Sequence, residues 1–100
     1  PSIIIAYCPC IAHGIKGGMS SSISMEKLAT SCGYFPIFRY DGKLNLDSPN
    51  VDFDLYEEFL NCQTRYSMLK SVNEERANQM LELNKRAAME RFDFYKNMCD

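Results

Sequence analysis

Two cysteines and the only histidine of the sequence fall within the segment Cys-Pro-Cys-Ile-Ala-His at residues 8–13. Thiolates are the usual ligands of iron–sulfur clusters, and imidazole is a common ligand of zinc or iron. Cys8 and Cys10 are separated by one residue, whereas zinc fingers and ribbons place roughly two to four residues between paired cysteines. The spacing also differs from a thioredoxin-like Cys-x-x-Cys. The pattern alone therefore favours small buried side chains in a tight turn, with His13 hydrogen-bonded to a carbonyl, over a metal site.

Other residues that could do chemistry form weaker patterns. The Lys-Gly-Gly stretch at residues 16–18 precedes a helix start and could cradle a phosphate, but it lacks the spacing of a phosphate loop. A flexible connection is the better interpretation. Cys32 and Cys62 fall in helical segments and are predicted to be core residues, and Cys99 is predicted to be exposed. Arg39 and Arg65 are predicted to pair with carboxylates.

The segment that must position the cysteines opens with three consecutive β-branched residues, Ile3, Ile4 and Ile5. Such a run predicts a strand over residues 2–7 that is buried on both faces, as in parallel sheets covered by helices. Residues 8–19 then form a loop beyond the carboxyl end of the strand, where open α/β sheets place ligands. Because one strand cannot form a sheet, we expect its neighbours to come from sequence outside these 100 residues.

The rest of residues 1–40 predicts a helix followed by a strand. Serines at 20–22 can cap a helix over about 22–32, and Gly33 is a natural stop for it. Aromatic and β-branched residues at 34–40 predict a strand, and Asp41-Gly42 predicts a turn. Residues 1–40 are thus expected to run strand, loop, helix, strand.

Residues 41–100 are expected to form an irregular connection and then helices. Apolar spacing predicts one or two helices between 52 and 70, with a break near Asn61, and a long helix over about 73–97. Asn73 is the predicted N-cap of the long helix. Its predicted apolar stripe consists of Ala77, Met80, Leu81, Ala88, Phe92 and Tyr95. The predicted fold is an α/β fragment with a mostly helical second part.

Composition limits the class of protein. The 100 residues suffice for one small domain, and a net charge of −2 does not favour nucleic acid or an anionic membrane as partner. The longest apolar run, residues 3–7, is too short to span a bilayer, and no basic segment precedes it as in a signal peptide. Five cysteines, an odd count, indicate a reducing compartment rather than secretion.

Taken in order along the chain, these segments resemble the C-terminal part of the thiamine diphosphate-binding domain of pyruvate:ferredoxin (flavodoxin) oxidoreductases. The most specific stretches are Pro-Cys-Ile-Ala-His-Gly at 9–14, Phe-Pro-Ile-Phe-Arg-Tyr at 35–40 and Arg-Phe-Asp-Phe-Tyr-Lys at 91–96. The resemblance also covers residues 1–8, 26–29, 46–49, 59–60 and 65–69. It implies that residues 1–100 are part of one catalytic domain, whose parallel sheet would include residues 2–7.

The resemblance also implies an activity and a cofactor set. Such enzymes decarboxylate pyruvate oxidatively to acetyl-coenzyme A with thiamine diphosphate, Mg²⁺ and 4Fe-4S clusters, and they pass single electrons to ferredoxin or flavodoxin. By position, Cys10 matches a ligand of a 4Fe-4S cluster, with Cys8 and His13 as neighbours that could tune the cluster or simply fix the loop. The other three ligands, and the Gly-Asp-Gly and Asn residues that hold thiamine diphosphate, have no counterpart in these 100 residues.

We therefore expect the isolated chain to be inactive and to bind none of these cofactors by itself. Its expected partners are the remainder of a homodimeric parent enzyme and its electron acceptor, in the cytoplasm or a hydrogenosome-like organelle of an anaerobe. The alternative is a non-catalytic remnant or interaction module that keeps the fold and holds no cluster. An upstream Cys-x-x-Cys with a Gly-Asp-Gly stretch would favour the enzyme.

Overall fold

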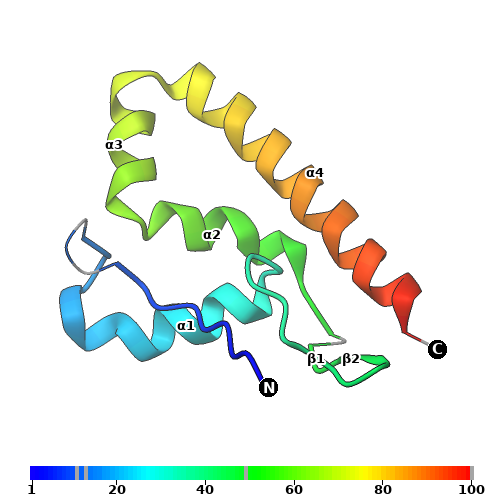
Figure 1. Ribbon diagram of the computed structural model, residues 1–100. Helices are drawn as coiled ribbons and strands as arrows, with labels where there is room; N and C mark the ends of the chain where they lie inside the picture. Colours follow the sequence, from blue (N-terminus) through cyan, green and yellow to red (C-terminus); the bar gives the residue numbers. More distant parts are fainter. Residues whose placement is uncertain (11, 13, 49, 100) are drawn as a thin grey trace.

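The structure is a computed structural model, which describes residues 1–10, 12, 14–48 and 50–99. Its elements form an open arrangement in which the long C-terminal helix runs back past the other helices toward a short hairpin (Figure 1). In chain order they are η1 (Gly18–Ser21), α1 (Ser22–Ser31), β1 (Phe38–Tyr40), β2 (Leu44–Leu46), η2 (Phe53–Leu55), α2 (Tyr56–Asn61), α3 (Thr64–Val72) and α4 (Glu74–Met98).

Helix α1 confirms the predicted helix over 22–32. It ends where expected, because Gly33 follows the C-cap with a φ of +88°, a left-handed conformation that glycine adopts without steric cost. Met25, Ala29 and Cys32 are buried, as one face of an amphipathic helix should be.

A two-stranded antiparallel hairpin follows α1. Strand β1 is shorter than the predicted strand over 34–40, and its partner β2 lies in the stretch predicted to be an irregular connection. The predicted turn at Asp41-Gly42 is confirmed, since Tyr40 faces Leu44 across it and Gly42 has a φ of +73°. The predicted pairing of Arg39 is also confirmed, because two guanidinium nitrogens lie 2.8 and 3.1 Å from the carboxylate oxygens of Asp47. Arg65 forms no ion pair with a carboxylate of the described residues.

The helical part agrees closely with the sequence pattern. Helix α2 ends at Asn61 and α3 begins at Thr64, so the predicted break near Asn61 is confirmed. Helix α4 begins after the predicted N-cap Asn73, whose side-chain oxygen accepts a hydrogen bond from the backbone N–H of Arg76 at 3.0 Å. That bond satisfies one of the donors that every helix start leaves open.

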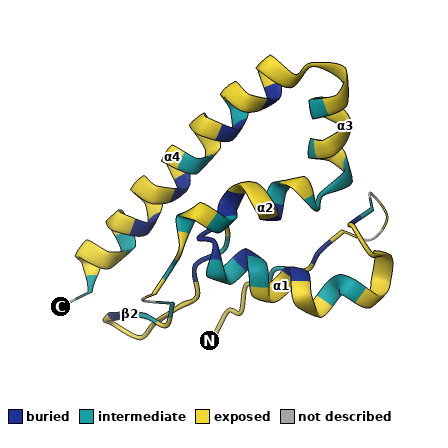
Figure 2. Cartoon of the chain, turned by 180° about the vertical axis from the view of Figure 1, so that it is seen from behind, coloured by how far each residue is buried: buried dark blue, intermediate teal, exposed yellow. Residues whose placement is uncertain are grey.

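The core lies where α1, α2 and α4 meet. Helix α4 contributes Leu81 and Ala88, α2 contributes Tyr56 and Phe59, and Ala29 and Cys32 come from α1 and its C-cap. Ala77 and Phe92 of the predicted stripe are also buried. Figure 2 shows buried residues recurring along α4 at helical spacing, while much of its surface is exposed. No helix among the described residues is both long and apolar enough to cross a membrane.

The first seven residues differ from the prediction. Residues 2–7 form no strand, and the side chains of Ile3, Ile4 and Ile5 are 85%, 91% and 74% exposed. Within the described residues, the only sheet is the β1–β2 hairpin, so the predicted strand over residues 2–7 does not form here and the predicted parallel sheet is not shown. The physical reason is that a strand needs partners for its backbone N–H and C=O groups, and no described strand pairs with residues 2–7.

Candidate functional site

Cys8 and Cys10 lie in an irregular segment, and both side chains are exposed. The buried turn that the spacing alone favoured is therefore wrong for the cysteines, although Pro9 between them is buried. The thiol of Cys8 donates to the carbonyl oxygen of the next residue, Pro9, at 3.6 Å. His13 lies outside the described residues.

The chain is anchored on both sides of Cys8 and Cys10. On one side the ring of Tyr7 packs against Tyr34 and Phe35, with ring centroids 5.7 and 5.6 Å apart. On the other side Ile15 is buried and pairs as an isolated β-bridge with Gln63, in the corner between α2 and α3. These two anchors flank Cys8 and Cys10, whose side chains are both exposed.

The described residues do not bring three or more metal-binding side chains together. Cys10 can therefore supply one ligand to a metal centre, but this part of the chain does not complete one.

The remaining cysteines lie away from this segment. Cys32 is fully buried and its thiol donates to the Ala29 carbonyl at 3.6 Å, which confirms the predicted core position. Burial raises the pKa of the Cys32 thiol, so it is a poor nucleophile at neutral pH. Cys62 is only half-buried. Cys99 is also half-buried, 3.4 Å from the Tyr95 carbonyl, so the prediction of an exposed Cys99 is wrong.

An aromatic cavity of about 540 Å³ lies beside the Tyr7 anchor. Its walls come from four places in the chain: Tyr7, the Tyr34-Phe35 loop, Tyr56 of α2 and Arg91 of α4. The sequence pattern missed this group, because its members are far apart in the chain and share no motif spacing. Only the packing of α2 against α4 brings them together.

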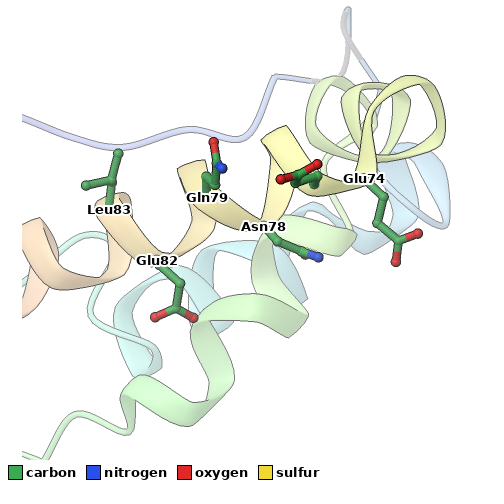
Figure 3. A pocket seen from close by; sticks show the side chains of 6 residues that line it. Glu74, Asn78, Gln79, Glu82 and Leu83 are labelled. Carbon is green, nitrogen blue, oxygen red and sulfur yellow. The ribbon is translucent and has the colours of Figure 1, made fainter.

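A larger hollow, of about 820 Å³, lies along the first half of α4. All the residues that line it belong to that one helix: Glu74, Glu75, Asn78, Gln79, Glu82 and Leu83. Figure 3 shows Gln79 and Leu83 pointing to one side of the helix, and Glu74 and Glu82 to the other. Because these groups do not converge on one point, the arrangement is a solvated helix face rather than a binding site.

Comparison with known proteins places the chain in a family, although no family model matches it. It is 35% identical over 107 residues to the pyruvate:ferredoxin oxidoreductase of Moorella thermoacetica, and 35% identical over 106 residues to the pyruvate-flavodoxin oxidoreductase of Enterobacter agglomerans. It is also 32% identical over 108 residues to the mitochondrial pyruvate dehydrogenase [NADP(+)] of Euglena gracilis.

These matches cover 100%, 98% and 100% of this chain, in the same order, but only 9%, 9% and 6% of the relatives. The chain thus spans less than a tenth of the length of the curated relatives it matches. About a third of the aligned residues are identical, and the alignment covers nearly the whole chain, so the similarity is not confined to a short shared motif. Over its full length, this chain is homologous to one short segment of the pyruvate:ferredoxin and pyruvate-flavodoxin oxidoreductases, and it belongs with that family.

Proposed function

We propose that the chain is part of an enzyme that oxidatively decarboxylates pyruvate to acetyl-coenzyme A and passes single electrons to ferredoxin or flavodoxin. The observation that carries the proposal is the similarity over at least 98% of the chain to enzymes whose names state pyruvate together with ferredoxin or flavodoxin. Residues 1–100 then form the C-terminal part of the domain that binds thiamine diphosphate.

Within that enzyme, Cys10 is the proposed protein ligand of one iron of a 4Fe-4S cluster. The exposed thiol on an anchored segment supports this role, since a ligand to a shared cluster must face outward from the chain that carries it. The cluster, when bound, carries electrons one at a time. Cys8 and His13 are proposed neighbours of the ligand that adjust its polarity.

Thiamine diphosphate, Mg²⁺, coenzyme A and the other cluster ligands are then held by the remainder of the enzyme. This division is supported by the described residues, among which no group of three or more metal-binding side chains forms. The isolated chain is accordingly proposed to be inactive, and formation of acetyl-coenzyme A by the chain alone would contradict this.

The exposed isoleucines fit the same proposal. Ile3, Ile4 and Ile5 together present a β-branched, apolar run with no strand beside it. In the complete enzyme we propose that residues 2–7 pair with strands from the remainder and become part of the thiamine-binding parallel sheet. The complete enzyme is a proposed homodimer in the cytoplasm or a hydrogenosome-like organelle of an anaerobe.

The test is a substitution of Cys10 in the longer polypeptide that contains these residues, purified without air. Cys10→Ala is expected to lower the iron content and to bleach part of the visible absorption of the iron–sulfur clusters, because one iron loses its thiolate. Cys8→Ala is the matched control, two positions away and also exposed, and should leave the iron content unchanged. Full iron content in the Cys10→Ala protein would sink the assignment.

The second candidate is a non-catalytic interaction module with the same fold. The exposed apolar side chains favour it, among them Val72 and Ile23 at 85% and 82% exposed. It predicts that the longer polypeptide binds no iron–sulfur cluster even when purified without air, and that Cys10→Ala changes nothing measurable.

A further inference from the structure

The aromatic cavity described above has the size and lining of a small-molecule site. Pockets for such ligands enclose roughly 300–1,000 Å³ and combine apolar or aromatic walls with a few polar groups. This cavity measures about 540 Å³. Around it the Tyr34 ring packs 4.7 Å from Phe59 and 6.2 Å from Tyr56, measured between centroids, so its aromatic wall is supported by the core.

The hydroxyl group of Tyr56 is the first polar group of the cavity. Tyr56 is only 4% exposed and lines the cavity, yet within the described part of the chain its hydroxyl makes no hydrogen bond. Every completely buried side-chain oxygen of the described residues has a hydrogen-bond partner. Because the Tyr56 hydroxyl has none, it must belong to the small part of Tyr56 that is exposed. A ligand acceptor would complete the hydrogen bond that the fold leaves open. Burial is the main reason why the pKa of Tyr56 is raised to about 12, and the phenol therefore stays a protonated donor at neutral pH.

Arg91 is the second polar group, and among the described residues it is the only charged one on the cavity wall. One guanidinium nitrogen donates to the backbone carbonyl of Tyr34 at 2.9 Å, which fixes the side chain beside the cavity. Among residues 1–10, 12, 14–48 and 50–99, no carboxylate pairs with it. A guanidinium has five N–H donors, so several remain for a ligand. Its positive charge also reaches the Tyr56 phenol, where it acts against the effect of burial.

We propose that this cavity binds a planar aromatic carboxylate. The ring system would lie against the side chains of Tyr34 and Phe35, and the carboxylate would accept hydrogen bonds from Arg91 and from the Tyr56 hydroxyl. An anion fits because the described residues of the wall include one positive charge and no negative one, and hydrogen bonds between charged groups are the stronger ones. A flat ring fits because aromatic pairs gain from offset or edge contacts. The inference does not depend on the proposed function, since Cys10 takes no part in it.

The test uses 2-naphthoate as the probe and the full 100-residue chain as the protein. Saturation-transfer NMR should show transfer to the naphthalene protons, with a Kd on the order of 1 mM, as expected of a ligand with so few atoms. The neutral probe 2-naphthalenemethanol, which has the same ring and no carboxylate, should bind about tenfold more weakly. Absence of transfer to 2-naphthoate, or equal binding of the two probes, would overturn the proposal.

Two variants locate the site. Tyr56→Phe removes only the unpartnered hydroxyl, so the fold should persist while the Kd for 2-naphthoate rises about tenfold. Arg91→Met keeps the apolar stem and should weaken binding by at least as much. Arg86→Met, about five positions earlier on α4 and outside the cavity lining, is the matched control and should bind as the natural chain does. If Tyr56→Phe binds 2-naphthoate unchanged, the probe sits elsewhere and the proposal is wrong, whatever Arg91→Met does.

Discussion

Single residues decide how the chain turns between its elements, and Gly33 is the clearest case. It follows α1 with a φ of +88°, and a Cβ placed there would meet the side chains of Phe53 and Val51. Two costs therefore coincide at this position: a backbone conformation that L-residues resist, and a collision with the packed segment before α2. Gly42 in the hairpin turn carries only the first cost, because a Cβ added there would have no neighbour within 4 Å.

The pair of glycines gives a prediction with an internal control. Gly42→Ala should lower the free energy of unfolding by about 1 kcal/mol, the cost of the left-handed backbone. Gly33→Ala should lower it by roughly 1–3 kcal/mol more, because Phe53 must also shift. Urea unfolding followed by circular dichroism measures both. Equal losses in the two variants would show that the contact with Phe53 is not significant.

The two exposed cysteines, Cys8 and Cys10, are also compared at the level of single residues. Both thiols are exposed, so exposure does not decide which one binds iron. The distinction between Cys8 and Cys10 comes from the resemblance to the family. The paired substitution described above is therefore the sharper measurement.

Elements are the next scale, and α4 dominates it. It has 25 residues, and its buried side chains contact α1 and α2 across the core. Helices in water gain most of their stability from packing one face, and a cap adds to it by closing an open donor. Asn73 provides that cap through its bond to the Arg76 N–H.

We predict that Asn73→Ala destabilises the chain by about 1 kcal/mol, as loss of an N-cap usually does. Asn78→Ala, on the exposed surface of the same helix, is the control. It should be neutral or slightly stabilising, because alanine is the better helix former. Midpoints of urea unfolding measure the difference, and a control variant that loses as much as Asn73→Ala would contradict the capping role.

The whole molecule is less compact than a self-sufficient domain of its length. Its radius of gyration is 14.8 Å, against about 13 Å for a typical 100-residue domain, and its extents are 45 × 28 × 22 Å. Large apolar side chains remain exposed at the N-terminal end, where Ile4 is 91% exposed. Both features are typical of a chain whose surfaces need further partners.

We therefore predict that the isolated chain self-associates through residues 2–7. A charge within an unpaired apolar strand blocks edge-to-edge pairing, so Ile4→Lys should weaken association about tenfold or more. Ile23→Lys changes an isoleucine that is 82% exposed on α1 and is the matched control. Sedimentation velocity over a range of concentrations gives the result. Equal weakening by both variants would mean that association is not specific to the N-terminal segment.

Local signals in the sequence determined the helices. Apolar spacing, the Asn73 cap, the Gly33 stop and the Asp41-Gly42 turn each act within a few residues, so α1, the break at Asn61 and α4 could be read directly. The resemblance identified the family without knowledge of the contacts, because it depends only on the order of residues along the chain. Tertiary structure alone decided the conformation of residues 2–7, the pairing of β1 with β2, and the cavity between Tyr56 and Arg91. These depend on partners distant in the chain, and a strand or a cavity exists only when those partners come together.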